Sequence, residues 1–237
     1  MRWFRKPRLR FLGVYPLVVW AAVGAQTTEW SFRVGVLLVV LGEALRLWAN
    51  GYVGAAKVNY SGPQPEAKIG SLITGGPYAF VRHPLYLGTF LLGAGFFVIV
   101  GNCWVGLAGL AFFLLAYRRK MAEEEVVLRH EGGSDGERYH AMVPRWLPSF
   151  RRYDRRCGQW CWAGIRASKE WKTVIWAAVL VIALYLREEW WQERDVFAPP
   201  HEMRQVVLVG ISIALIAADL IAELRRKQRK SAVPLGT

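Results

Sequence analysis

Cysteine and histidine are scarce in this sequence, which removes two common ways of holding a fold together. The 237 residues include three cysteines and four histidines. Cys157 and Cys161 fall in a segment expected to face the reducing cytoplasm, where disulfides do not persist. Their C-x3-C spacing offers two metal ligands, but structural zinc needs four and no matching pair lies nearby. We therefore expect free thiols and no metal site.

Acidic residues are also few, and the positive charge that remains is unevenly spread. The chain has 18 Asp and Glu against 31 Lys and Arg, a formal net charge of +13. Such an excess can indicate nucleic-acid binding, but here basic segments alternate with base-poor ones. The basic segments are 2–10, 57–82, 118–172 and 225–230, and the base-poor ones are 26–33, 101–102 and 187–204. This is the positive-inside pattern, so we expect the basic segments to meet anionic membrane lipids and no nucleic acid.

Long apolar blocks make up much of the chain. They cover residues 11–25, 34–48, 85–100, 103–117, 174–186 and 206–222. Each block approaches the roughly 20 apolar residues of a membrane-spanning helix, and tryptophans near the ends suit an interfacial belt. A soluble helical bundle would instead show periodic apolar stripes. We predict an all-α polytopic membrane protein with about six transmembrane helices and both termini in the cytoplasm.

The third and fourth blocks form one predicted hairpin that turns near Gly101-Asn102. Residues 118–130 are expected to continue the helix into the cytoplasm, and the glycine-rich stretch 131–136 to end it. Beyond residue 150, arginines interleaved with tryptophans suit a helix lying on the inner membrane face. We therefore predict two parts. Residues 1–150 form a four-span core with a cytoplasmic functional segment, and residues 151–237 form a basic interfacial segment with two further spans.

Ionisable side chains gather at both ends of this hairpin, and hence on one side of the membrane. The entrance segment 76–88 holds one cluster, and residues 118–125 hold the other. Polar groups at the edge of hydrocarbon are costly unless they are paired, solvated or bound to a ligand. Because both clusters occur together, we expect the site at the cytoplasmic end of the hairpin, where a water-soluble and a lipidic reactant can meet.

Each cluster alone also has a simpler interpretation. Arg82 and His83 suit a positive membrane anchor, and the nearby tyrosines suit an aromatic belt. The pairs Arg119–Glu123 and Lys120–Glu124 are spaced to form i,i+4 ion pairs, although in the less favourable order.

Two motifs carry a family resemblance. The first is G-x-Y-x-x-x-R-H-P-x-Y-x-G, which runs from Gly76 to Gly88. The second is an Arg followed by an acidic run, a Gly, a Tyr and Val-Pro; it consists of Arg118, residues 123–125, Gly133, Tyr139 and Val143-Pro144. Together they resemble the isoprenylcysteine carboxyl methyltransferase family and its phospholipid methyltransferase relatives, over residues 70–150.

The resemblance implies an integral-membrane methyltransferase that uses S-adenosylmethionine without a Rossmann domain. A missing G-x-G-x-x-G unit is therefore no evidence against this cofactor. The implied cofactor-site residues are Tyr78, Arg82, His83, Tyr86, Gly88, Glu124, Tyr139, Val143 and Pro144. Arg118 and Glu123 match the family's pair nearest the methyl acceptor, and we assign them as catalytic.

The default acceptor is a lipidic or prenyl-like carboxylate, as in isoprenylcysteine carboxyl O-methylation. A carboxylate is already nucleophilic, so the enzyme would need only to align it. The guanidinium group of Arg118 would orient this carboxylate. For a phospholipid amine, Glu123 is the candidate base; for a thiol, Arg118 would favour the thiolate. Alternatives of another class are an NADPH-dependent membrane lipid reductase and a non-catalytic membrane scaffold. The sequence does not decide the acceptor, the oligomeric state, the membrane or the role of residues 151–237.

Overall fold

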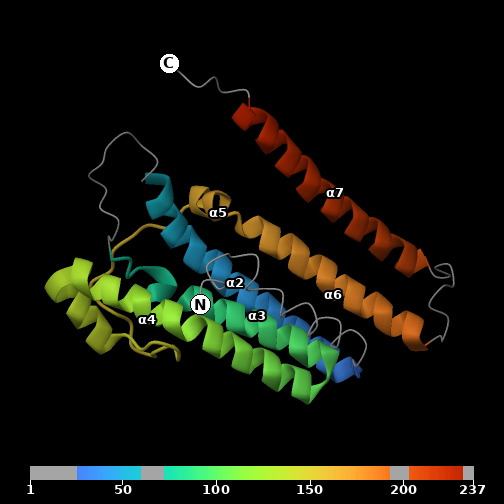
Figure 1. Cartoon of the computed structure of the whole chain (residues 1–237), viewed down its shortest axis with the longest axis horizontal. Coiled ribbons are helices and arrows are strands. Elements are labelled where there is room, and N and C mark those ends of the chain that lie inside the picture. Colours follow the sequence, from blue (N-terminus) through green and yellow to red (C-terminus); the bar gives the residue numbers. More distant parts are fainter. Residues whose placement is uncertain (1–25, 60–71, 193–202, 232–237) are drawn as a thin grey trace, which may run out of the picture. The chain divides into compact units, whose positions relative to one another are not determined.

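The computed structural model describes residues 26–59, 72–192 and 203–231, and every regular element within them is helical (Figure 1). The chain divides into two compact units, Met1–Glu170 and Trp171–Thr237. The elements of the first unit are α2 (Glu29–Asn59), η3 (Gly76–Ala79), α3 (Pro84–Val100), α4 (Cys103–Met142) and α5 (Trp162–Ser168). Next come α6 (Glu170–Gln192) and α7 (Met203–Ser231). The predicted all-α class is confirmed.

The predicted hairpin is formed by α3 and α4, and local signals fix its ends. Pro84 opens α3 with a φ angle already suited to a helix. Gly101 ends α3 in the left-handed conformation, with φ of 69°, which glycine adopts without strain. The side chain of Asn102 then caps α4 by accepting hydrogen bonds from the amides of Trp104 (3.1 Å) and Val105 (3.2 Å). The turn therefore lies where the sequence placed it.

Paired glycines bring α2 and α3 into close backbone contact. A Cβ atom at Gly42 would lie 2.7 Å from the carbonyl oxygen of Gly88, and one at Gly95 would lie 2.6 Å from that of Gly35. Small residues at such positions let helices approach closely in a membrane. In consequence α3 packs much more extensively on α2 than on α4.

The C-terminal part of α4 bends sharply at Gly133, where φ is 52° and ψ is −138° (Figure 1). The sequence predicted that the glycine-rich stretch 131–136 would end the helix, and the helix does break there. However, it resumes at once and continues to Met142. Because of this bend, Tyr139 and the residues after it return toward the entrance of α3.

Residues 151–161 differ from the prediction of an interfacial helix, because they form no regular element. Their backbone hydrogen bonds go instead to the entrance segment: the amide of Tyr153 donates to Ala79 (3.0 Å), and the amide of Thr74 donates to Cys157 (3.1 Å). Only the short helix α5 follows, packed on α2. The first compact unit thus extends to Glu170, whereas the predicted boundary lay at residue 150.

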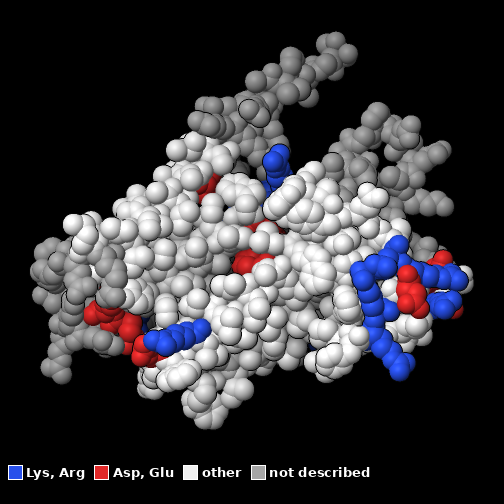
Figure 2. Space-filling model, turned by 180° about the vertical axis from the view of Figure 1, so that it is seen from behind, with Lys and Arg blue, Asp and Glu red and all other residues white. Residues whose placement is uncertain are grey.

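The membrane topology is only partly supported. Within the described residues, one helix segment, Gln205–Ala222, has the length and composition of a membrane span, and Pro84–Val100 is apolar but shorter. The predicted blocks from 34–48 onward all lie inside helices, while block 11–25 falls outside the described residues. Figure 2 shows one face on which most of the described side chains are uncharged; charged side chains form clusters toward its edges, and a few acidic ones also lie near its middle. Six spans therefore remain a proposal.

Candidate functional site

A small core at the end of the hairpin opposite the Gly101 turn holds the two motifs together. Ala79, Tyr139, Val143 and Tyr153 form this core, and the rings of Tyr139 and Tyr153 meet edge to face with centroids 5.3 Å apart. The Tyr139 hydroxyl donates to the carbonyl oxygen of Tyr78 at 2.8 Å. Because this core joins residues 76–82 to residues 139–153, it sets the position of the side chains at the start of α3.

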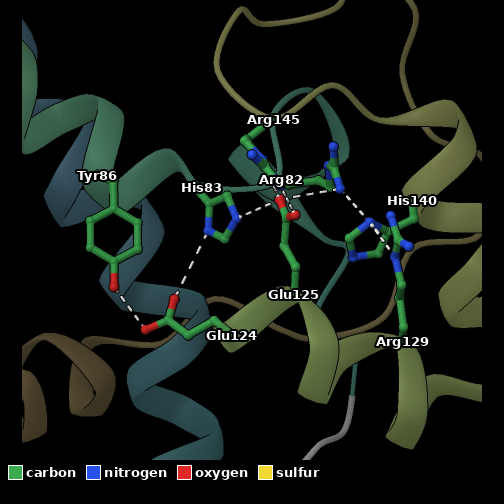
Figure 3. Close-up of polar contacts among 8 residues, drawn as sticks. All are labelled: Arg82, His83, Tyr86, Glu124, Glu125, Arg129, His140 and Arg145. Carbon is green, nitrogen blue, oxygen red and sulfur yellow. Dashed lines mark hydrogen bonds and ion pairs between the residues drawn. The ribbon is translucent and has the colours of Figure 1, made fainter. Parts of the chain in front are cut away.

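Glu125 is the centre of the polar cluster (Figure 3). Its carboxylate accepts hydrogen bonds from Nε2 of His83 (3.1 Å) and from Nε of Arg145 (2.7 Å), and a terminal nitrogen of Arg82 lies 3.2 Å from it. A second guanidinium nitrogen of Arg145 pairs with the other carboxylate oxygen, which makes the contact bidentate. The backbone amide of Arg82 also donates to Pro144 (2.9 Å). One buried acid therefore joins α4, the entrance of α3 and the segment after α4.

The charges around Glu125 keep it ionised. Burial alone would raise the pKa of this carboxyl group, but the hydrogen bonds from Arg145 and His83, with the charges of Arg82 and Arg145, outweigh burial. The pKa of Glu125 falls to about 2. An ionised carboxylate only accepts hydrogen bonds, so Nε2 of His83 must carry the hydrogen.

His83 is held as a neutral ring beside a second, more accessible carboxylate. Burial lowers the pKa of His83 despite the hydrogen bond to Glu125 and the charges of both acids. With the hydrogen on Nε2, the Nδ1 lone pair is free, and Nδ1 lies 4.0 Å from Glu124. Glu124 accepts a hydrogen bond from the Tyr86 hydroxyl (2.7 Å) and is 43% exposed. Glu124 therefore presents an accessible acceptor next to the buried ion pairs, flanked by the buried His83 ring and the partly buried Tyr86.

His140 completes the cluster on its far side. Its Nδ1 accepts a hydrogen bond from Nε of Arg129 (3.2 Å) and also contacts Arg82. Burial, together with the positive charges of Arg82 and Arg129, lowers the pKa of His140 to about 4. The neutral ring therefore keeps its Nδ1 lone pair, which faces both arginines.

The lowered pKa values of His83 and His140 predict that the folded protein loses stability in mild acid. The folded-state pKa of His140 is lowered from 6.5 to about 4, so between these values the unfolded chain binds a proton that the folded chain does not. Stability should therefore fall as pH drops through this window, and His83 acts in the same direction. In H140Q, which cannot titrate, thermal unfolding in detergent should depend less steeply on pH between 6.5 and 4. An equally steep dependence would contradict this assignment.

The structure brings together some of the predicted site residues. Arg82, His83, Tyr86 and Glu124 share the cluster in Figure 3. Three further predicted residues are buried within the supporting core or lie next to it, where they expose little side chain; they are Tyr78, Tyr139 and Val143. Pro144 contributes its carbonyl oxygen to Arg82.

Three predicted residues stand apart. Gly88 faces α2, since a Cβ there would lie 2.6 Å from Cγ of Arg46. Arg118 and Glu123 are exposed, and within the described residues neither side chain forms a hydrogen bond or ion pair. Five residues apart on a helix, they point about 140° from one another. Arg118 lies on the side of α4 that carries Glu125, whereas Glu123 points away from it.

The central residue, Glu125, was not among the predicted site residues, nor were Arg145 and His140. A helical signal for Glu125 did exist in the sequence. Tyr117, Met121 and Glu125 follow one another at i,i+4 spacing, which places the third acid of the run on an otherwise apolar stripe. Arg145 had no comparable signal, because it reaches Glu125 only through the bend at Gly133.

Comparison with known proteins supports the motif-based prediction. The phospholipid methyltransferase family pattern matches residues 30–130. This range contains Arg82, His83, Tyr86, Glu124 and Glu125, but not His140 or Arg145. The resemblance to these methyltransferases is confirmed.

Curated relatives add detail to this resemblance. The chain is 32% identical over 119 residues to human protein-S-isoprenylcysteine O-methyltransferase, a match covering 50% of this chain and 42% of the relative. The protein of that name from Xenopus laevis is 33% identical over 123 residues, covering 50% and 41%. The chain thus spans less than half the length of these methyltransferases. No solved structure matches this chain.

Proposed function

We propose that this protein is an integral-membrane methyltransferase that transfers a methyl group from S-adenosylmethionine to a lipidic carboxylate, as in isoprenylcysteine carboxyl O-methylation. The observation that carries the proposal is the convergence of both motifs on Glu125, with the accessible Glu124 beside it. The names of the similar proteins support the carboxylate acceptor. We also propose about six spans, with both termini and the site in the cytoplasm.

The residues present fit this cofactor. Glu124 is a half-exposed carboxylate that can accept hydrogen bonds from an ammonium or from ribose hydroxyls. The free Nδ1 lone pair of His83 offers a further acceptor next to it, and the Tyr86 ring lies 5.6 Å from the His83 ring, centroid to centroid. Acceptors and aromatic faces of this kind suit a cationic, nucleoside-containing molecule.

When bound, S-adenosylmethionine would supply an electrophilic methyl group on a positively charged sulfur. The chain's own residues would bind the cofactor and orient the methyl acceptor. Glu124, His83 and Tyr86 would hold the cofactor, while Glu125 would keep the guanidinium groups of Arg82 and Arg145 neutralised and in place. Arg118 would align the acceptor carboxylate, and exclusion of water would keep that carboxylate reactive.

Binding of S-adenosylhomocysteine to the purified protein in detergent tests the cofactor site. Glu124→Gln should weaken binding about tenfold or more, because the charged acceptor is lost while its shape is kept. The matched control is Glu137→Gln on the exposed resumed part of α4, which should bind as the wild type does. Isothermal titration calorimetry gives the comparison. Preferential binding of NADPH by the wild type would overturn the proposal in favour of a lipid reductase.

The family description favours a second candidate acceptor, a phospholipid amine. Label transferred from methyl-labelled cofactor to a lipid extract separates the two acceptors. A carboxyl methyl ester releases its label in mild base, whereas a methylated amine retains it. Base-stable label would therefore replace carboxylate methylation with amine methylation.

A further inference from the structure

The chain after α4 returns to the entrance of α3 and is held there by its backbone. We call residues 144–153 the return segment. Three backbone hydrogen bonds join it to residues 79–82: from Arg82 to Pro144 (2.9 Å), from Ser149 to Phe80 (2.8 Å) and from Tyr153 to Ala79 (3.0 Å). Because residues 79–82 come just before Pro84, where α3 begins, the return segment lies at the level where this apolar helix starts.

Two large apolar side chains of the return segment point away from the core. Leu147 is 79% exposed and Phe150 is 106% exposed, the highest value for a large apolar residue within the described ranges. Single exposed apolar residues are common on protein surfaces and need no explanation by themselves. These two differ because hydrogen bonds fix the backbone on both sides of them. The fold therefore holds both side chains outward.

Unpaired positive charge accompanies these apolar side chains. Arg151 and Arg152 are exposed, and in the part of the chain that the structure describes neither guanidinium forms an ion pair. Arg155, just beyond the return segment, is instead paired with Asp135 at 2.7 Å. Residues 138–153 include no acidic residue. Exposed apolar side chains next to unpaired arginines are typical of segments that bind an anionic membrane surface.

We propose that the return segment carries a docking surface for the anionic headgroup region of the membrane, formed by Leu147, Phe150, Arg151 and Arg152. This inference rests on the membrane location proposed above, but not on methyl transfer. The apolar side chains would enter the boundary between headgroups and acyl chains, while the guanidinium groups would bind lipid phosphates or carboxylates. An acidic protein would offer the same charge, but the position of the segment beside the start of α3 favours lipid.

Docking would connect the membrane surface with the Glu125 cluster. The return segment also carries Arg145, which binds both carboxylate oxygens of Glu125. Once Leu147 and Phe150 are anchored, the backbone of Arg145 is fixed between this anchor and the hydrogen bond at Pro144. The cluster would thus be held at the membrane boundary, where a lipidic acceptor arrives from the bilayer.

Fluorescence quenching by doxyl-labelled lipid tests this surface in the full chain. The protein, with its three cysteines replaced by serine, is placed in nanodiscs of phosphatidylcholine and phosphatidylglycerol and carries one nitrobenzoxadiazole label at a time. Labels at Leu147→Cys and Phe150→Cys should be quenched about twofold, since interfacial side chains enter the headgroup boundary by about 5–10 Å. The control is Ser134→Cys, which is exposed and about 25 Å along α4 from Tyr117. Its label should keep its fluorescence.

A label inside the hairpin separates failure of the docking surface from failure of the proposed function. Leu115→Cys, on the apolar part of α4 at a position 63% exposed, should be quenched if the hairpin lies in the bilayer. Quenching at Leu115→Cys alone, or equal quenching at Ser134→Cys and Phe150→Cys, would overturn the docking surface and leave the proposed membrane enzyme in place. No quenching at Leu115→Cys would overturn the membrane location, and the docking surface with it.

Lipid charge provides the second test. Replacing both Arg151 and Arg152 by glutamine should reduce quenching at Phe150→Cys, because each arginine near an anionic surface changes the docked-to-undocked ratio about fivefold. Nanodiscs of phosphatidylcholine alone should have the same effect. Arg155→Gln is the matched control, since Asp135 already pairs with this arginine, and it should leave quenching unchanged. Equal quenching with and without the two arginines, or shielding of the label only by an added farnesylated acidic peptide, would overturn docking on anionic lipid.

Discussion

Replacing Glu125 by alanine is expected to destabilise the protein by about 3 kcal/mol or more and to abolish S-adenosylhomocysteine binding. The carboxylate is 6% exposed and pairs with two guanidinium groups. Removing one partner of a buried ion pair leaves uncompensated charge, which typically costs about 3–5 kcal/mol. The Arg82 side chain is 12% exposed and would bear most of this cost, while the more exposed Arg145 can turn toward water.

Thermal unfolding in detergent and calorimetric binding measure the two effects of this substitution. Glu137→Ala, which removes an exposed acid of the same helix, is the control. It should change neither the unfolding temperature nor the affinity for S-adenosylhomocysteine. Glu125→Gln keeps the size of the side chain but not its charge, and should resemble Glu125→Ala. If Glu125→Gln were as stable as the wild type, the carboxylate charge would not be what holds the cluster together.

The Arg118→Ala variant is expected to transfer methyl groups to a carboxylate acceptor about 10²–10³-fold more slowly in kcat/KM, with S-adenosylhomocysteine binding unchanged. Loss of one positioned donor at a reacting oxygen has an effect of about this size. Arg118 is exposed, so its guanidinium is available to a ligand. Arg118→Lys keeps the charge but cannot form two parallel hydrogen bonds with a carboxylate, so its kcat/KM should lie between those of the wild type and Arg118→Ala.

The neighbouring Arg119 provides the matched control for Arg118. It carries the same charge and is also exposed, but it points about 100° away around the helix. Arg119→Ala should therefore retain transfer. Equal losses of methyl-transfer rate in both variants would indicate a general effect of positive charge at the membrane surface. An unchanged rate in Arg118→Ala would show that Arg118 does not align the acceptor carboxylate.

Features set by short stretches of sequence were predictable. The hairpin ends depend on Pro84, Gly101 and Asn102, each of which acts on its own or adjacent backbone. The break near Gly133 has a similarly local cause. Arg82, His83, Tyr86 and Glu124 were recognised because they belong to short motifs at the two ends of one hairpin.

Long-range contacts were less predictable. Residues 151–161 have the composition of an interfacial helix, yet the amide of Tyr153 donates to Ala79, and the carbonyl oxygen of Cys157 accepts from Thr74, both far earlier in the chain. Gly88 was assigned to the cofactor, but only the packed structure shows that α2 occupies its free side. In both cases, the deciding partner is distant in sequence, and no local pattern records it.

The sequence by itself determined that this chain is helical and carries two motifs that resemble those of methyltransferases, because hydrophobic blocks, helix caps and motif spacing are properties of neighbouring residues. Only the tertiary structure decided that Glu125 is the centre of the cluster. The physical reason is that a buried charge is defined by the groups around it. Those groups, Arg82, His83 and Arg145, come together only after α4 has bent and the chain has returned to the entrance of α3.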